Sequence, residues 1–172
     1  MQGGNLLQLA DAQTIPRGLG CFQARKRGPH LLRNPKMSKI DTAKAFFDAC
    51  ETGKGWAGCA AYCQADATFA FQADALAETT TLEAYSEWMK GLLGPVPDGR
   101  YELTAFAFDE ERDTAIASAV FHGTNTNDGP VPATGKTVAS DYAYVIAFDG
   151  DKVSHMTKIW NDVQALRALG WG

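Results

Sequence analysis

Two carboxylates and one amine near the end of the sequence are the residues best suited to chemistry. A hairpin turn at Asp149-Gly150 would place Asp141 on one strand opposite Lys158 on the next. Asp162 follows that second strand, and strand alternation puts it on the same predicted face. A carboxyl group that is shielded from water beside aromatic rings can both take and return a proton. The spacing therefore predicts that Asp162, Asp141 and Lys158 share one face of the sheet, which makes them the candidates for acid/base chemistry.

The other residues of this predicted face fit the wall of a pocket. Ala139, Ala143 and Ala147 are small and leave volume, whereas Met156 and Trp160 would line the space. Ligand pockets in proteins are mostly apolar and hold a few placed polar groups. A solid core would not contain this many charges, because a buried charge without a partner is costly.

Two structural interpretations compete with the catalytic one. Asp141 and Lys158 could form an ordinary cross-strand ion pair at the edge of the sheet. Asp162 precedes the last helix, where an aspartate is a good N-cap. The residues alone leave both alternatives open.

The elements that must position these residues predict an α+β fold. Apolar periodicity and turn residues predict helices over 43–52, 56–63, 82–93 and 162–169, and strands over 67–71, 101–108, 114–124, 138–148 and 152–161. Helices followed by a long antiparallel meander can bury their apolar stripes only against one face of the sheet. We expect a curved sheet wrapped around helices and enclosing a space.

The C-terminal half of the sequence resembles a known family. Its segments are Gly123-Thr124-Asn125-Thr126-Asn127, Pro132-Ala133-Thr134-Gly135-Lys136, Asp149-Gly150-Asp151-Lys152, and Asp162 before Leu166-Arg167-Ala168-Leu169-Gly170. Together with the element order, these segments resemble the SnoaL-like polyketide cyclase group of the nuclear transport factor 2-like superfamily. Asn125 and Asn127 stand where that group carries His and Gly. The motif match spans about residues 121–170, and the resemblance in fold spans 38–171.

The resemblance implies a cone-shaped fold in which N-terminal helices pack on a curved antiparallel sheet that encloses a pocket. It also implies that Asp162 is the general acid/base of an intramolecular aldol step, without a cofactor. In that step Lys158, Asn125 or a tyrosine would hydrogen-bond the developing enolate oxygen. The expected substrate-binding residues are Asn125, Trp160, His122, Met156 and Trp88.

The opposite sheet face is predicted to be aromatic and uncovered, with Tyr142, Tyr144 and Phe148 on it. Exposed apolar faces indicate self-association, and the resemblance implies a homodimer through this surface. Three functions follow as hypotheses: an acid/base enzyme of the aldol cyclase or isomerase type on a small carbonyl compound, a non-catalytic module that binds a small ligand, and a dimerisation module.

The first 37 residues differ from the rest in charge. They hold six basic residues and one acid, whereas the 172-residue chain has a formal net charge of −4. The segment is rich in Gly and Pro and lacks an apolar period, which predicts a tail outside the fold, followed by one domain over 38–172. Its apolar run is too short for a secretory signal, a transit peptide fits loosely, and Met37 is an alternative first residue.

Composition and cysteine spacing exclude several other classes. The sequence is acidic overall, which argues against nucleic acid as a partner, and it has no apolar run long enough to span a membrane. Cys59 and Cys63, four residues apart, are predicted to be core residues of one helix, with no disulfide and no metal site. We expect a cytoplasmic protein without a cofactor.

Overall fold

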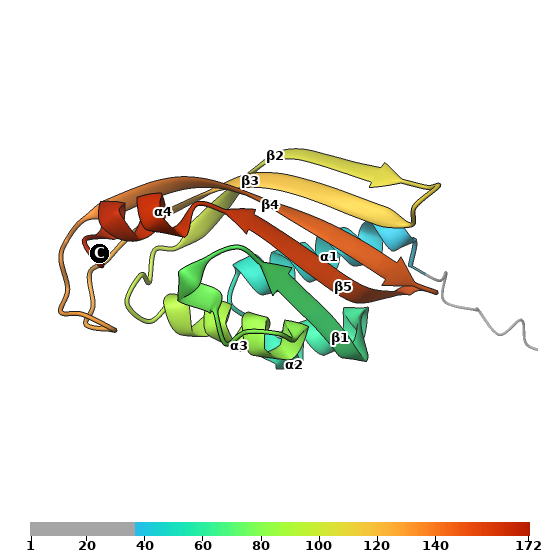
Figure 1. Ribbon diagram of the computed structural model, residues 1–172, viewed down its shortest axis with the longest axis horizontal. Helices are drawn as coiled ribbons and strands as arrows, with labels where there is room; N and C mark the ends of the chain where they lie inside the picture. Colours follow the sequence, from blue (N-terminus) through green and yellow to red (C-terminus); the bar gives the residue numbers. More distant parts are fainter. Residues whose placement is uncertain (1–36) are drawn as a thin grey trace, which may run out of the picture. The chain divides into compact units, whose positions relative to one another are not determined.

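The computed structural model describes residues 37–172, which form helices packed on a single five-stranded sheet (Figure 1). In chain order the elements are α1 (Lys39–Glu51), α2 (Gly55–Cys59), η1 (Ala60–Tyr62), β1 (Cys63–Phe71), η2 (Asp74–Leu76), α3 (Leu82–Leu92), β2 (Arg100–Asp109), β3 (Thr114–Thr124), β4 (Thr137–Asp149), β5 (Lys152–Trp160) and α4 (Asp162–Leu169). The predicted α+β class is confirmed. The predicted basic tail lies, apart from Met37, outside the described residues.

Side-chain caps fix where the first long helices begin. Ser38 caps α1, since its hydroxyl accepts a hydrogen bond from the Asp41 amide at 3.1 Å. The helix therefore begins four residues before the predicted start. Thr81 caps α3 in the same way through the Ala84 amide at 3.1 Å, as the sequence predicted. No helix within residues 37–172 is long and apolar enough to cross a membrane.

The strands lie in the order β1-β5-β4-β3-β2. Strands β2 to β5 form the predicted antiparallel meander. Strand β1 instead runs parallel to β5 at the edge, so the sheet is mixed, and the prediction of a fully antiparallel sheet was wrong there. No hairpin joins β1 to β5, because α3 and three strands separate them in sequence. A connection of that length allows a parallel pair.

The register between β4 and β5 differs from the prediction. Residues 150–151 form the turn, rather than Asp149-Gly150, and a bulge then leaves Ser154 without a partner in the register. Tyr144 consequently pairs with Lys158. A shift of one residue exchanges the two faces of a strand, so the predicted pairing of Asp141 with Lys158 was wrong.

The exchange of faces buries the residues that were predicted to be exposed. Tyr142, Tyr144 and Ile146 lie beneath the helices and are at most 5% exposed. Asp141 lies on the outer face, where it pairs with Val120 of β3. The prediction of an uncovered aromatic face was therefore wrong, and the homodimer that was inferred from this face stays a prediction.

The core fills the space between the sheet and helices α1, α2 and α3, which lie on one face of it (Figure 1). Phe47 of α1 packs edge-on against Tyr144 at a ring-centroid distance of 5.1 Å. Tyr85 of α3 stacks on Phe69 of β1 at 4.3 Å. Aromatic pairs of this kind add to the stability that burial alone supplies. The core therefore brings α1, α3, β1 and β4 to a common centre.

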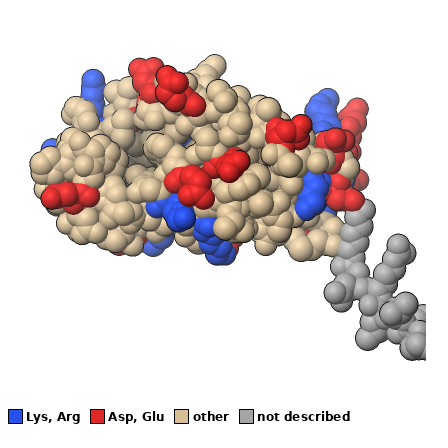
Figure 2. Space-filling view, turned by 90° about the horizontal axis from the view of Figure 1, so that it is seen from below, with Lys and Arg blue, Asp and Glu red and all other residues tan. Residues whose placement is uncertain are grey.

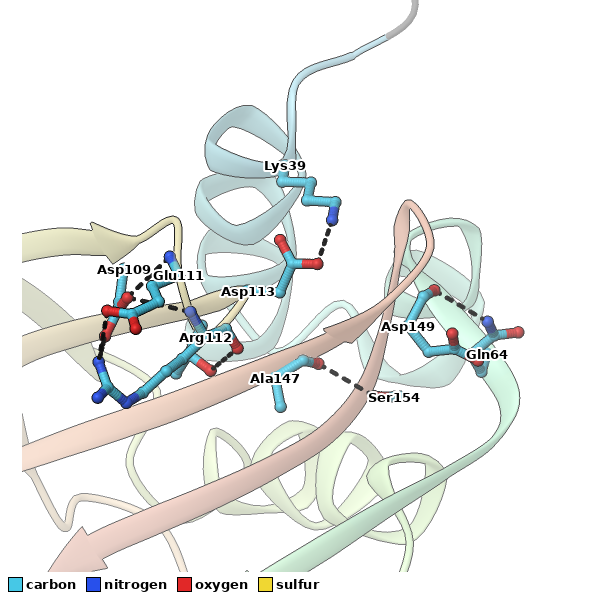
Figure 3. A network of polar contacts seen from close by, with 10 residues as sticks. Lys39, Gln64, Asp109, Glu111, Arg112, Asp113, Ala147, Asp149 and Ser154 are labelled. Carbon is cyan, nitrogen blue, oxygen red and sulfur yellow. Dashed lines mark hydrogen bonds and ion pairs between the residues drawn. The ribbon is translucent and has the colours of Figure 1, made fainter.

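Charged side chains gather at the end of the domain that holds the β2–β3 turn (Figures 2 and 3). Lys39 pairs with Asp113 at 2.7 Å, and Arg112 pairs with Asp109 at 2.9 Å. These pairs are partly to largely exposed, and exposed ion pairs contribute about 0–1 kcal/mol. These ion pairs therefore contribute little to the stability of the fold.

Candidate functional site

A buried carboxylate and a buried amine lie at the two ends of a series of tyrosine hydroxyls. Glu51 is the last residue of α1 and is 1% exposed, and Lys158 of β5 is 6% exposed. Between them lie Tyr142 and Tyr144 of β4 and Tyr85 of α3. We call these five residues the Glu51–Lys158 cluster.

The hydrogen bonds of the cluster run in one direction. The Glu51 carboxylate accepts from the Tyr142 hydroxyl at 2.7 Å and from the Tyr144 hydroxyl. Because a hydroxyl has one proton to donate, Tyr144 must accept from the hydroxyl of Tyr85. The Lys158 ammonium group then donates to the Tyr85 oxygen at 2.9 Å. An unbroken series of donors thus leads from Lys158 to Glu51.

Aromatic rings surround the Lys158 amine. The ring centroids lie 4.7–5.9 Å from its Nζ atom and belong to Trp160, Tyr142, Tyr85, Tyr144 and Trp88. The negative faces of aromatic rings attract a cation. The cage therefore offsets part of the free energy that Lys158 loses when it is removed from water.

Burial shifts the pKa values of the cluster in opposite directions. Loss of solvent lowers the pKa of Lys158 below its ordinary value, and the Glu51 charge opposes that shift. Burial raises the pKa of Tyr85, Tyr144 and Tyr142, and the Glu51 charge raises each further. The tyrosines therefore keep their protons, while Lys158 releases its proton more readily than a surface lysine.

The stability difference between wild type and Lys158→Met should rise with pH. Between the lowered pKa of Lys158 and about pH 10, the folded protein binds fewer protons here than the unfolded chain does. The stability that Lys158 contributes is therefore present above its unfolded pKa and lost as pH falls through the folded pKa. Urea unfolding of both proteins across this range checks the slope, and a flat or falling difference would contradict it.

The cluster forms one wall of a cavity of about 30 Å³, which we call the central cavity. Glu51, Tyr142 and Lys158 supply its polar wall. The remaining lining is largely apolar and includes Trp88, Trp160, Trp171, Phe121, Leu166 and Leu169. A cavity of this size holds roughly two water molecules. The arrangement presents a carboxylate and an amine to a small, mostly apolar space.

Trp171 brings a second polar group to the central cavity. Its indole Nε1 is buried and has no hydrogen-bond acceptor among the described residues. The Trp160 indole differs, because its Nε1 donates to the Ser140 hydroxyl at 3.0 Å. Buried donors in proteins are nearly always paired. Among the described residues, the Trp171 N–H therefore lacks the acceptor that a buried donor normally has, and the ring that carries it lines the central cavity.

Four members of the cluster were not among the predicted site residues: Glu51, Tyr85, Tyr142 and Tyr144. A signal for Glu51 was present, since it follows Phe47 by four residues and so shares the buried side of α1. The two strand tyrosines were assigned to the other face because the bulge at Ser154 was not predicted. Tyr85 lies in the helix predicted over 82–93, but it was not singled out as a site residue.

Three of the predicted residues meet at the central cavity, namely Lys158, Trp160 and Trp88. Met156 is fully buried in the core beside them and does not line the cavity. Asp141 is exposed on the outer face of the sheet, in a shallow depression with Ile159. The structure therefore separates Asp141 from the other candidates.

Asp162 is held by main-chain groups on both sides. Its Oδ1 atom accepts from the Val163 amide at 2.8 Å, and its Oδ2 atom accepts from the Ala75 amide at 3.2 Å. Asn161, and not Asp162, caps α4, through the Gln164 amide at 3.1 Å. Asp162 thus ties α4 to η2 and is not among the residues that line the central cavity. Its role in proton transfer stays a prediction.

Asn125 joins two loops and is fully buried. Its side-chain amide donates to the carbonyl oxygens of Pro95 at 3.1 Å and of Asn127 at 2.9 Å. Its side-chain oxygen accepts from the Thr134 amide at 2.9 Å. These contacts use the polar atoms of the side chain within the protein, and Asn125 does not line the central cavity.

Asn125→Ala should lower the free energy of unfolding by about 1–3 kcal/mol, because it removes three hydrogen bonds that a fully buried side chain makes to the main chain. Asn127→Ala is the matched control, since Asn127 is exposed and its amide makes one hydrogen bond, to the Gly94 carbonyl at 2.9 Å. Urea denaturation compares the two. Equal losses in both variants would contradict the structural role of Asn125.

His122 lies away from the central cavity. Its Nε2 atom is 3.3 Å from a Glu102 carboxylate oxygen on the neighbouring strand. It lines a surface depression with Asp98 and Arg100, whereas the preceding residue, Phe121, lines the cavity. The predicted substrate-binding role of His122 therefore has no counterpart in the geometry of the cavity.

The cysteines in the described part of the chain are all reduced and buried: Cys50, Cys59 and Cys63. Cys59 ends α2 and Cys63 begins β1, so the prediction that they share one helix was wrong. Within residues 37–172, no group of three or more His, Cys, Asp or Glu side chains is placed to hold a metal ion.

Solved structures share this fold. AclR of Streptomyces galilaeus, a proposed hydroxylase, is 17% identical, with a TM-score of 0.63 over 78% of this chain and 85% of its own. IdmH of Streptomyces antibioticus, a proposed polyketide cyclase, is 18% identical, with a TM-score of 0.61 over 78% and 99%. A nuclear transport factor 2-like protein of unknown function from Burkholderia pseudomallei is 11% identical, with a TM-score of 0.58 over 78% and 98%. Identities this low establish the fold alone.

The family follows from a sequence comparison that covers most of the domain. The model of the SnoaL-like domain matches residues 43–156, which include most of α1, the whole of β1 to β4 and the first half of β5. A comparison with curated proteins finds no match. With its helices packed on a curved mixed sheet, the chain belongs to the SnoaL-like family of the nuclear transport factor 2-like fold.

Proposed function

We propose that this protein is a cofactor-free acid/base enzyme of the aldol cyclase or isomerase type, acting on a small carbonyl compound. The observation that carries the proposal is the Glu51–Lys158 cluster, which presents a buried carboxylate and a buried amine to one largely apolar cavity. Structural ion pairs do not need an adjoining cavity, whereas ligand sites combine an apolar lining with a few polar groups.

Each polar group has a role in removing a proton next to a carbonyl. Glu51 accepts the proton, because its carboxylate lines the cavity and is held in place by the hydroxyls of Tyr142 and Tyr144. Negative charge develops on the carbonyl oxygen as the proton leaves. The Trp171 N–H and the positive charge of Lys158 stabilise that oxygen, as donors in a site that excludes water do.

The relatives and the cavity together limit the substrate. IdmH, with the same fold, is a proposed polyketide cyclase, and polyketides carry carbonyl groups whose neighbouring protons are acidic. A cavity of about 30 Å³ has room for only about two water molecules, so a ketone as small as acetone already requires Trp88, Trp160 or Trp171 to move. A small aldehyde or ketone needs the least movement, and a larger ring system needs more.

Exchange of carbon-bound protons for deuterium tests this function. The full chain is incubated in D₂O with acetone, cyclohexanone or acetylacetone, and proton NMR follows the loss of the signal next to each carbonyl. We expect exchange that is faster than in buffer and that saturates with ketone concentration. Rates equal to the buffer rate for all three compounds would contradict the proposal.

A non-catalytic ligand-binding module is the second candidate, and the unpartnered Trp171 N–H favours it as much as it favours an enzyme. Binding of a ketone, seen as quenching of tryptophan fluorescence, without any proton exchange would identify the protein as such a module.

A further inference from the structure

The position and the hydrogen bonding of the Lys158 amine suit a nucleophile. Its amine belongs to the cavity wall, and among the described residues its hydrogen-bond partner is the Tyr85 hydroxyl at 2.9 Å, not a carboxylate. A lysine that only neutralised Glu51 would contact that carboxylate directly. Instead, the hydroxyls of Tyr85 and Tyr144 separate the two charges.

The separation gives the amine a route by which to lose its proton. Lys158 donates to Tyr85, Tyr85 donates to Tyr144, and Tyr144 donates to Glu51. When Lys158 gives a proton to Tyr85, Tyr85 passes its own proton to Tyr144, and Tyr144 passes its own to Glu51. The amine and the carboxylic acid are then both neutral. Burial disfavours the charge on Lys158 and so makes it easier for the amine to release its proton.

We infer that the Lys158 amine condenses with an aldehyde or ketone in the central cavity to form a protonated imine. This inference rests on the proposed function and defines its substrate class as unhindered aldehydes and ketones, β-diketones included. A neutral amine in an apolar pocket is the form in which lysine attacks carbonyl carbon.

The step balances without an external reagent. The Lys158 nitrogen forms a bond to the carbonyl carbon, the C=O π bond breaks, and the nitrogen gives up one of its protons to the oxygen, which yields a neutral carbinolamine. That hydroxyl then takes a second proton and leaves as water, while C=N forms. Glu51 returns the proton that it received from Lys158, and nothing is oxidised or reduced.

The Trp171 N–H supports the same step. It is a buried donor on the cavity wall with no acceptor among the described residues. The oxygen of a carbonyl under attack gains negative charge and needs such a donor. A β-diketone has two carbonyl oxygens. After the first oxygen has left as water, the second can accept a hydrogen bond from the Trp171 N–H.

Acetylacetone is the probe for the experiment. With a nucleophilic lysine it forms a stable enaminone, which absorbs in the near ultraviolet and adds the mass of one diketone less one water. The full chain is treated with a small excess of acetylacetone, digested and mapped by tandem mass spectrometry. We expect one modified lysine, Lys158, and saturation of the absorbance at one adduct per chain.

Variants locate the reaction and its proton path. Lys158→Met should abolish the near-ultraviolet absorbance, whereas Lys90→Met, which removes an exposed lysine of α3, should leave it unchanged. Tyr85→Phe interrupts the series of hydroxyls and should slow adduct formation about tenfold or more. It should also move the pH dependence downward, because the Lys158 ammonium group loses its hydrogen-bond acceptor. The modified lysine is identified in the wild-type protein, so the result can be interpreted even if Lys158→Met misfolds.

The outcomes separate this inference from the proposed function. Modification confined to surface lysines, together with proton exchange in the ketone assay, would overturn the imine and leave acid/base catalysis standing. An adduct on Lys158 without proton exchange would support the imine and overturn the catalytic function. Absence of both would overturn both.

Discussion

Glu51→Ala lowers the free energy of unfolding by about 3–5 kcal/mol, which is the usual cost of removing one member of a buried charged pair. The Glu51 carboxylate is 1% exposed and accepts hydrogen bonds from Tyr142 and Tyr144. Its removal leaves two buried hydroxyls without their acceptor and the positive charge of Lys158 without compensation. Urea denaturation with the wild-type protein alongside measures the loss.

A double-mutant cycle shows whether that loss comes from the cluster. The double variant Glu51→Ala/Lys158→Met removes both charges, and methionine fills much of the lysine volume. We expect the double variant to be more stable than the sum of the two single losses predicts, because each single variant leaves a buried charge alone. Additive losses would show that Glu51 and Lys158 do not interact through the tyrosines.

Glu51→Gln should lower the rate of proton exchange next to a carbonyl by about 10²–10⁴-fold, the range that a placed general base supplies. The amide keeps the volume of the side chain and an oxygen that can accept from Tyr142 or Tyr144, so the fold is retained. It cannot take a proton. The measurement is the initial rate in D₂O with acetylacetone, after circular dichroism has shown that the variant is folded.

Two further variants make that result specific. Glu83→Gln changes an exposed glutamate of α3 and should leave the rate unchanged. Asp162→Asn decides between the two carboxylates, because Asp162 bonds to main-chain amides instead of lining the cavity. A loss in Asp162→Asn with full activity in Glu51→Gln would assign proton transfer to Asp162, as the sequence motif predicted.

The order of the elements could be predicted from the sequence because their signals are local. Alternating apolar residues placed β2 to β5 within one or two residues, and Thr81 marked the start of α3. The SnoaL-like resemblance, which the family model confirms, rests on short segments that are equally local. The parallel pairing of β1 with β5 has no local signal, since it depends on a long connection.

The candidate site could be predicted only in part, since it depends on one bulge. Lys158, Trp160 and Trp88 were found because their own strand or helix faces the cavity whatever β4 does. The bulge at Ser154 exchanges the two faces of β4 relative to the prediction. Tyr142 and Tyr144 therefore lie on the inner face, and Asp141 does not. No turn residue marks that bulge. A single unpaired position thus changed the predicted chemistry from two carboxylates to a tyrosine-linked pair.

A crystal structure of the full chain soaked with acetylacetone tests most directly whether the central cavity is the site. We expect the diketone between Trp88, Trp160 and Trp171, with one carbonyl carbon at the Lys158 nitrogen and an oxygen within hydrogen-bond distance of the Trp171 indole. A central cavity left without ligand, while the diketone occupies the depression beside Asp141 or the one beside His122, would contradict the account.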